Sequence, residues 1–155
     1  MKNKNILIFL LGFSLSLSPL FTAATAGADE LPPPDGKPLS AILKSVEEQK
    51  TGVVTSAEFD DGWWEIETCQ AGACQKLYID PKSGQENRRR QAGSDDELPP
   101  AGALPLSAVV QSVEDRGLGV VTEAEFDDGF WEIELRRDGR KSKLDIDPMT
   151  GDIRR

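Results

Sequence analysis

The pattern of apolar and polar positions changes period twice along the chain, each time from a helical spacing to an alternation. Around residue 40, apolar residues follow the i, i+3, i+4, i+7 spacing of an amphipathic helix: Leu39, Ile42, Leu43 and Val46. Residues 53–79 then alternate between apolar and polar, as strands with one buried face do. Both patterns return in the second half, so we expect one helix followed by strands in each half.

The predicted helices have start and stop signals. Ser40 and Ser107 are residues that favour the N-cap position, where a side-chain oxygen accepts a hydrogen bond from a backbone N–H group of the first turn. Gly52 follows the apolar spacing in the first copy and the pair Gly117 and Gly119 follows it in the second, and we expect these glycines to stop the helices. The spacing therefore predicts two short helices, each with its apolar face toward the core.

Two hairpin turns in each half set the register of the strands. Asp61-Gly62 and Asp128-Gly129 are strong signals for two-residue turns, and Ala71-Gly72 and Asp138-Gly139 supply the next ones. Turns centred there predict these pairs in the first half: Phe59 with Trp64, Ala57 with Ile66, Trp64 with Ile79, Ile66 with Leu77, and Glu67 with Lys76. The second half gives the equivalent pairs Trp131 with Ile146, Ile133 with Leu144, and Glu134 with Lys143. Because both turns place the same residues on one face, each half predicts a three-stranded meander covered by its helix.

The two halves are copies of one another. Roughly 28 of about 50 aligned positions are identical without a gap, beginning with Leu39-Ser40-Ala41 and Leu106-Ser107-Ala108. Proline, glycine and acidic residues precede each copy, and we expect these stretches not to pack. The predicted organisation is an α+β protein of two tandem small modules, each one helix packed on a three-stranded antiparallel meander. Its boundaries are 1–28 (signal peptide), 29–37 (flexible leader), 38–87 (module 1), 88–104 (linker) and 105–155 (module 2).

A family resemblance rests on the end of each meander. The closing turns are Asp80-Pro81-Lys82-Ser83-Gly84 and Asp147-Pro148-Met149-Thr150-Gly151. A short helix followed by a meander that ends in Asp-x-x-Ser/Thr-Gly resembles the PepSY family, in both copies. The resemblance implies a module similar to the propeptides of thermolysin-type metallopeptidases, for which an inhibitory role was proposed, and it brings no catalytic residues. It also implies a partner among exported or envelope proteins, such as a peptidase or a sensor.

The N-terminus has the features of a secretory signal peptide. Lys2 and Lys4 precede the apolar run 6–17, and both Ala24-Thr25-Ala26 and Ala26-Gly27-Ala28 fit the small-x-small cleavage pattern. The apolar run is shorter than the roughly 20 residues of a spanning helix, so we expect cleavage and no stable membrane insertion of the mature chain. In a bacterium with two membranes, this predicts a periplasmic protein.

Charge and composition exclude several classes of function. The chain has 18 basic and 27 acidic residues, a formal net charge of -9, which disfavours binding to nucleic acid. It contains no histidine, the usual general base and the commonest metal ligand. No nucleophile motif such as Gly-x-Ser-x-Gly is present. We therefore expect a non-enzymatic protein without catalytic residues, metal ligands or cofactors.

Cys69 and Cys74 are the only cysteines. The predicted register places them directly opposite each other, at a separation that a disulfide spans. Export to an oxidising compartment favours that bond. The alternative is a redox-active dithiol, which would lack the Cys-x-x-Cys spacing. The second copy has Arg136 and Lys141 at these positions, so a disulfide would be a local staple.

The face of the sheet turned away from the helices is the predicted binding surface. The register sets Glu58 beside Glu65 and Glu125 beside Glu132, with Asp145 next. Like charges opposite each other across strands cost stability, so these rows indicate either a solvated, aggregation-resistant face or a docking surface. The aromatic residues Trp63 and Phe130 lie on the same face, either as binding contacts or packed on another part of the chain.

Two hypotheses for function follow. The first is a periplasmic protein-binding or regulatory module that inhibits or modulates a peptidase or an envelope sensor through the acidic face. The alternative is a periplasmic divalent-cation or small-ligand binding protein. Asp60-Asp61-Gly62 and its repeat lack the ligand spacing of an EF-hand loop, which favours hairpin turns over calcium sites there.

Overall fold

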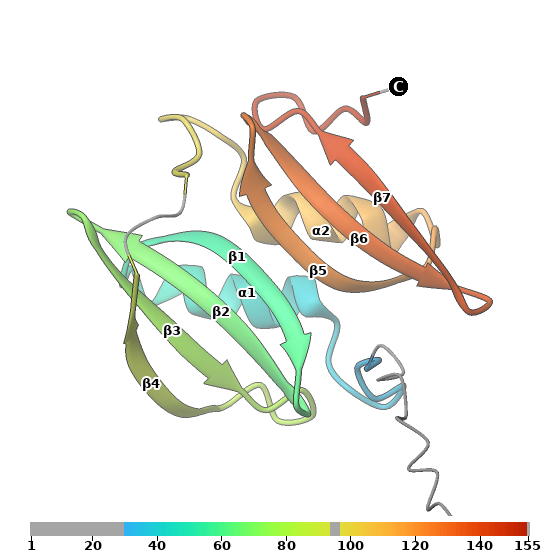
Figure 1. The fold of residues 1–155 in the computed structure, drawn as a ribbon, viewed down its shortest axis with the longest axis horizontal. Coiled ribbons are helices and arrows are strands. Elements are labelled where there is room, and N and C mark those ends of the chain that lie inside the picture. Colours follow the sequence, from blue (N-terminus) through green and yellow to red (C-terminus); the bar gives the residue numbers. More distant parts are fainter. Residues whose placement is uncertain (1–29, 94–96, 155) are drawn as a thin grey trace, which may run out of the picture.

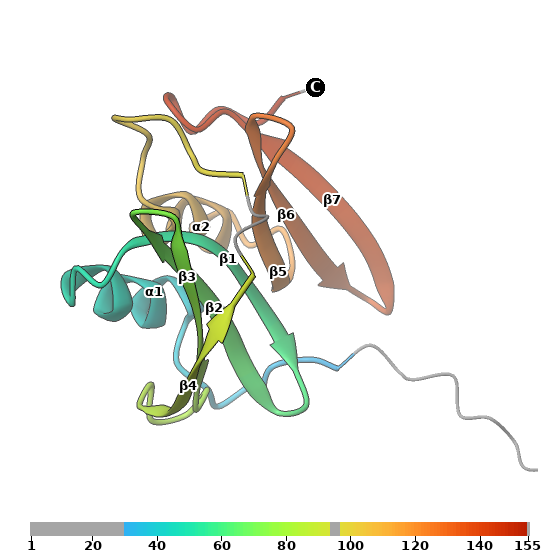
Figure 2. The ribbon, with the colours of Figure 1, turned by 60° about the vertical axis from the view of Figure 1, so that its left-hand side comes forward.

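The two copies join edge to edge in the computed structural model, which describes residues 30–93 and 97–154. Copy one contains α1 (Leu39–Glu48), β1 (Val53–Asp60), β2 (Trp63–Gln70), β3 (Ala73–Ile79) and β4 (Glu86–Ala92). Copy two contains α2 (Leu106–Asp115), β5 (Val120–Asp127), β6 (Phe130–Arg137) and β7 (Arg140–Ile146). In these ranges the strand order is β4-β3-β2-β1-β5-β6-β7, and both helices lie on one face of the antiparallel sheet (Figures 1 and 2).

The predicted register within each copy is confirmed. Every predicted pair is present, including Phe59 with Trp64 and Trp131 with Ile146. Asp61 and Gly62 have φ values of 48° and 82°, so both central residues of this turn are in the left-handed region that a type I′ hairpin requires. The α+β class and the order of helix and meander are therefore as the sequence predicts.

The prediction of two modules with three strands each is corrected, because the strands of both copies form one sheet. β1 and β5 pair antiparallel over three positions, Ser56 with Glu125, Ala57 with Ala124, and Glu58 with Glu123. The two alanines at the centre are fully buried. β4 adds a further strand to copy one, so the described ranges form one seven-stranded sheet.

β4 lies where the sequence predicts a linker, since residues 88–92 belong to it. It pairs with β3 along its length, from Cys74 with Ala92 to Tyr78 with Arg88. Its residues are exposed up to Gln91, so it has none of the alternation that identifies a half-buried strand. In copy two the corresponding contact is the single bridge between Ile146 and Ile153.

The stretches before the helices pack against their own copies, contrary to the prediction. The Lys37 N–H donates to the Pro81 carbonyl at 2.8 Å, and the Leu104 N–H donates to the Pro148 carbonyl at 2.8 Å. Lys82 also pairs with Asp35 at 2.8 Å. Each stretch is thereby tied to the turn that closes its meander. The predicted signal peptide lies outside the described residues.

The two helices cap each other across the copies. Ser40 and Ser107 are not N-caps, because the helices already begin after Pro38 and Pro105. Both serines lie in the first turn and donate to a carboxylate of the other helix. The Ser107 backbone N–H lies 3.0 Å from Glu47 Oε1 and its hydroxyl bonds the same carboxylate, and Ser40 contacts Glu114 in the same way. This reciprocal pair shows that α1 and α2 lie side by side and antiparallel, with the N-terminus of each helix bound to a glutamate near the C-terminus of the other.

Gly117, with a φ of 60°, follows the C-cap residue Arg116 of α2 and ends that helix as predicted. The other two predicted glycines, Gly52 and Gly119, have a different role. Both helices end four residues earlier, at Glu48 and Asp115. At Gly52, φ is 152° and a Cβ atom would lie 2.7 Å from the Cys69 carbonyl oxygen. This glycine therefore lets the start of β1 approach β2.

Candidate functional site

The sheet face opposite the helices carries acidic side chains from both copies. Side chains alternate between the faces of a strand, and the residues of the other face, such as Ile66 and Ile133, are fully buried under the helices. The register places ten carboxylates on the open side, which we call the carboxylate face: Glu58, Asp60, Glu65, Glu67, Glu123, Glu125, Asp127, Glu132, Glu134 and Asp145.

The junction between β1 and β5 joins these carboxylates into rows that cross the sheet. One row runs Tyr78, Glu65, Glu58, Glu123, Glu134 and Lys143 from β3 to β7. The next row runs Lys76, Glu67, Ser56, Glu125, Glu132 and Asp145. The sequence predicts the short rows within each copy, whereas Glu58 facing Glu123 follows only from the junction.

Lysines neutralise the outer parts of the carboxylate face. Lys76 lies 2.9 Å from Glu65 and 3.2 Å from Glu67. Burial alone would lower the pKa of Lys76, but hydrogen bonds and charge attraction from the two glutamates outweigh it and raise that pKa. In copy two Lys143 lies 2.9 Å from Glu132, and this contact raises the pKa of Lys143.

Glu134 is the most enclosed carboxylate of this face, with 5% of its surface exposed. Lys141 forms an ion pair with it, Arg136 lies 3.3 Å away, and the Thr122 hydroxyl donates to it at 3.3 Å. Burial opposes its charge, but the bonds from Lys141 and Thr122 and the attraction of both cations hold its pKa below the usual range. Glu134 is therefore charged and paired.

Glu123 and Glu125, near the junction, have raised pKa values, in contrast to Glu134. Burial raises the pKa of Glu123, and the nearby carboxylates Glu125, Glu58 and Glu134 raise it further. Burial also raises the pKa of Glu125, with Lys143 acting against it. The centre of the face thus holds negative charge that the fold only partly compensates.

Removing one central charge is expected to stabilise the protein. Glu123→Gln should raise the free energy of unfolding at pH 7 by a few tenths to about 1 kcal/mol, because like charges opposite each other across strands are destabilising. The pKa of Glu123 is raised in the folded state, so the wild-type protein loses stability as pH rises from the ordinary value of 4.5 through that pKa. The advantage of the variant should therefore be present at neutral pH and vanish near pH 4.5, as urea unfolding at several pH values would show.

The matched control is Glu132→Gln, which removes a carboxylate that already pairs with Lys143. It should give no gain at any pH. An equal gain from both variants would show that the junction carries no special repulsion.

Aromatic residues of this face contact arginines of the chain. Phe130 is half-buried, with the Arg154 guanidinium 4.4 Å from its ring centroid. Trp63 is also half-buried. Tyr78, which the sequence does not single out as a site residue, is 1% exposed and has two arginines over its ring.

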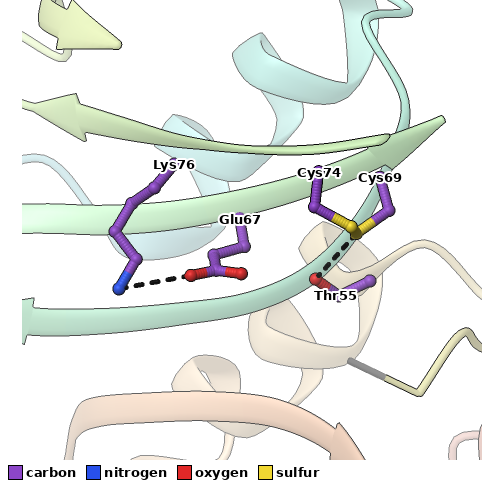
Figure 3. Close-up of a disulfide and its surroundings, with 5 residues drawn as sticks. All are labelled: Thr55, Glu67, Cys69, Cys74 and Lys76. Carbon is purple, nitrogen blue, oxygen red and sulfur yellow. Dashed lines mark hydrogen bonds and ion pairs between the residues drawn. A yellow bond between two sulfur atoms is a disulfide. The ribbon is translucent and has the colours of Figure 1, made fainter. Parts of the chain in front are cut away.

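The predicted disulfide is present. Cys69 and Cys74 are bonded across the β2–β3 hairpin with their Cα atoms 4.1 Å apart. Both are 4% exposed, and the Thr55 hydroxyl lies 3.9 Å from Cys69 Sγ (Figure 3). Because exchange requires access to sulfur, this burial supports a structural staple over a redox-active dithiol.

An acidic cluster lies beside the β1–β2 turn. Glu30, Asp60 and Asp61 are exposed, and one oxygen of each lies within 4.8 Å of the others. They border a cavity of about 410 Å³ that extends to Glu58 and Glu123. The hairpin turn predicted at Asp61-Gly62 is confirmed, while the approach of Glu30 depends on the path of the leader.

Comparison with known proteins identifies the repeated unit. The profile of the PepSY_2 family, described as "Peptidase propeptide and YPEB domain", matches residues 8–90 and again residues 88–155. The chain belongs to the PepSY family. The two matches make it a tandem PepSY protein, and the family description names peptidase propeptides.

One solved structure resembles this tandem PepSY chain, a protein of Clostridium difficile 630 described as a "putative lipoprotein". It is 16% identical, with a TM-score of 0.46, and the match covers 74% of this chain and 88% of the other. No curated protein sequence matches the chain. Within the described residues, neither helix is long and apolar enough to cross a bilayer.

Proposed function

We propose that this tandem PepSY protein is an exported, non-enzymatic binding protein that docks a basic surface of another exported or envelope protein on its carboxylate face. The observation that carries the proposal is the β1–β5 junction, which brings Glu58 and Glu123 together at the centre of the sheet face that neither α1 nor α2 covers (Figure 2). The helices cover the other face, so the carboxylate face is the broad surface left for a partner (Figure 2).

The electrostatics of the junction support a basic partner. Folding has already paired the outer carboxylates with Lys76, Lys141 and Lys143. Glu123 and Glu125 have raised pKa values and are crowded by like charge. Basic groups of a partner would relieve that repulsion on binding, and complementary charge also speeds association and excludes acidic partners.

The family supports a regulatory role. A module described as a peptidase propeptide domain acts by contact with a peptidase, and the absence of histidine removes the usual catalytic base. We therefore propose a peptidase or an envelope sensor as the partner and inhibition or modulation as the effect.

Export is part of the same proposal. Lys2, Lys4 and the apolar run 6–17 form the pattern of a signal peptide. The Cys69–Cys74 bond suits an oxidising compartment, since disulfides persist there and are reduced in the cytosol. Both features support the periplasm as the site of action.

Cation binding has weaker support. Glu30, Asp60 and Asp61 together offer three exposed carboxylates. A calcium ion takes about six to eight oxygen ligands, so this cluster supplies at most part of a coordination shell. The carboxylate face remains the better-supported site.

Charge reversal on the carboxylate face tests the proposal. The mature chain of residues 29–155 is used to capture proteins from periplasmic extract, and the affinity of each captured protein is then measured in purified form. Glu125→Lys with Glu132→Lys should weaken the specific partner at least about tenfold, since the loss of roughly 1.4 kcal/mol of attraction has that effect. The affinity for the wild-type chain should also fall with added salt.

The matched control reverses two charges on the helix side, Glu48→Lys with Asp115→Lys, both exposed at the ends of α1 and α2. This variant has the same net charge as the test variant and should keep its partner. Equal loss in both variants would show that binding depends on net charge alone. Full binding by the test variant would disprove the docking face.

A further inference from the structure

Two arginines of β4 have their guanidinium groups over the ring of Tyr78, at the edge of the carboxylate face. Arg88 is paired with Tyr78 across the strands, and Arg90 is paired with Lys76. The guanidinium carbons lie 3.9 Å and 4.8 Å from the centroid of the Tyr78 ring. Because Arg88 and Arg90 alternate with Arg89, they share the face of Glu65 and Glu67, whereas Arg89 lies on the opposite face. We call Arg88 and Arg90 the arginine rim.

Among the described residues, neither arginine of the rim has an acidic partner, unlike the lysines of the carboxylate face. Lys76, Lys141 and Lys143 each pair with a glutamate of the carboxylate face. Arg89 is bound to Glu86 at 2.7 Å. Across residues 30–93 and 97–154, no carboxylate forms an ion pair with Arg88 or Arg90, although several glutamates lie two strands away.

Tyr78 holds the rim in place. This residue is 1% exposed, and its hydroxyl is buried without a hydrogen-bond partner in the described chain. Such a tyrosine serves the structure mainly through its ring, and the stacking of guanidinium planes on an aromatic face restricts their orientations. An ordered guanidinium presents a fork of N–H donors that matches a carboxylate with less loss of entropy than a free side chain. Copy two has Asp145 at the position of Tyr78, so it lacks this arrangement.

We propose that the partner bound on the carboxylate face is a mixed-charge surface, with basic groups over the β1–β5 junction and carboxylates that bind the arginine rim. This inference rests on the proposed function and adds the acidic part of the partner and its direction across the sheet. Four strand spacings of about 4.8 Å separate β4 from β5, a distance of roughly 19 Å. An extended segment covers that distance in about six residues.

Two synthetic peptides test the proposal at low ionic strength. The mixed peptide has four lysines, a spacer of about six Gly and Ser residues and four glutamates, and the control peptide has glutamines in place of the glutamates. The mature wild-type chain should bind the mixed peptide about fivefold more tightly, equivalent to roughly 1 kcal/mol from exposed ion pairs. The net charge of the protein predicts the reverse order, because the control peptide is the more cationic one.

Variants of Arg88 and Arg90 test whether these residues cause the preference for the mixed peptide. Arg88→Gln with Arg90→Gln should remove the preference for the mixed peptide and leave the affinity for the control peptide unchanged or slightly higher. Each single variant leaves one guanidinium over Tyr78 and should keep about half of the free-energy difference between the two peptides. The single variants replace the double variant in the test if the double variant does not fold. Arg137→Gln with Arg140→Gln, which removes two charges from the opposite face of the β6–β7 hairpin, should keep the preference in full.

The outcomes separate this inference from the proposed function. Equal affinity for the two peptides, or a preference that survives loss of the rim, overturns the mixed-charge partner. The docking face would still stand if Glu58→Gln with Glu123→Gln weakens the control peptide. Failure of the wild-type chain to bind either peptide would overturn both.

Discussion

A fragment of residues 96–155 is expected to unfold at a much lower urea concentration than the mature chain of residues 29–155. In the complete protein, copy two pairs β5 with β1 and packs α2 against α1. Both contacts between serine and glutamate, Ser40 with Glu114 and Ser107 with Glu47, cross between the copies. Hydrogen bonds to charged groups contribute about 1.5–3 kcal/mol each, so the fragment loses about 3–6 kcal/mol from these two alone. That is a large part of the roughly 5–15 kcal/mol by which small proteins are stable.

Urea unfolding followed by far-UV circular dichroism measures this effect in both chains. Ser107→Ala provides the control. It should destabilise the complete chain by about 1.5–3 kcal/mol. It should leave the stability of the fragment unchanged, because the fragment lacks Glu47. A fragment that unfolds cooperatively at the midpoint of the complete chain would show that each copy is a self-sufficient domain.

Trp131→Ala should destabilise the complete chain by about 3–5 kcal/mol, as expected when a large aromatic side chain is removed from a core. Trp131 is 1% exposed and lies edge to face with Phe126, the ring centroids 5.2 Å apart. Its core is continuous with that of copy one beneath the helices. We therefore expect Trp131→Ala to destabilise copy one as well, although Trp131 belongs to copy two.

The Cys69–Cys74 bond reports on copy one in the same experiment. Both sulfurs are buried, so a thiol reductant reaches them only when copy one opens. Trp131→Ala should speed reduction of this disulfide at least about tenfold. Trp63→Ala, which removes a half-buried indole from the carboxylate face, is the control and should have a smaller effect. An unchanged rate of reduction in Trp131→Ala would mean that the copies unfold independently.

The hairpins show why much of this fold could be predicted. The pairs of β1 with β2 and of β2 with β3 follow from turns such as Asp61-Gly62 and from the period of two. The same register predicts the Cys69–Cys74 bond and the facing glutamates Glu58 and Glu65. These contacts join residues that are close in the sequence, so turn chemistry and alternation suffice to define them.

Residues outside the hairpins were less predictable. Ser40 has the chemistry of an N-cap, but Pro38 already precedes the helix, and the serine bonds Glu114 of the other copy instead. β4 carries almost only exposed polar residues, so backbone pairing with β3 and the stacking of arginines on Tyr78 decide its structure. Neither feature leaves an apolar pattern in the sequence.

By itself the sequence determined the duplicated unit, the helix and three-stranded meander of each copy, the disulfide and the short acidic rows. Only the tertiary structure decided that β1 pairs with β5, that the helices cap each other, and that the acidic rows meet at Glu58 and Glu123. The physical reason is that the alternation of β1 is the same whether its free edge faces water or another strand. That choice depends on the free energy of packing two complete copies together, and a local pattern does not record it.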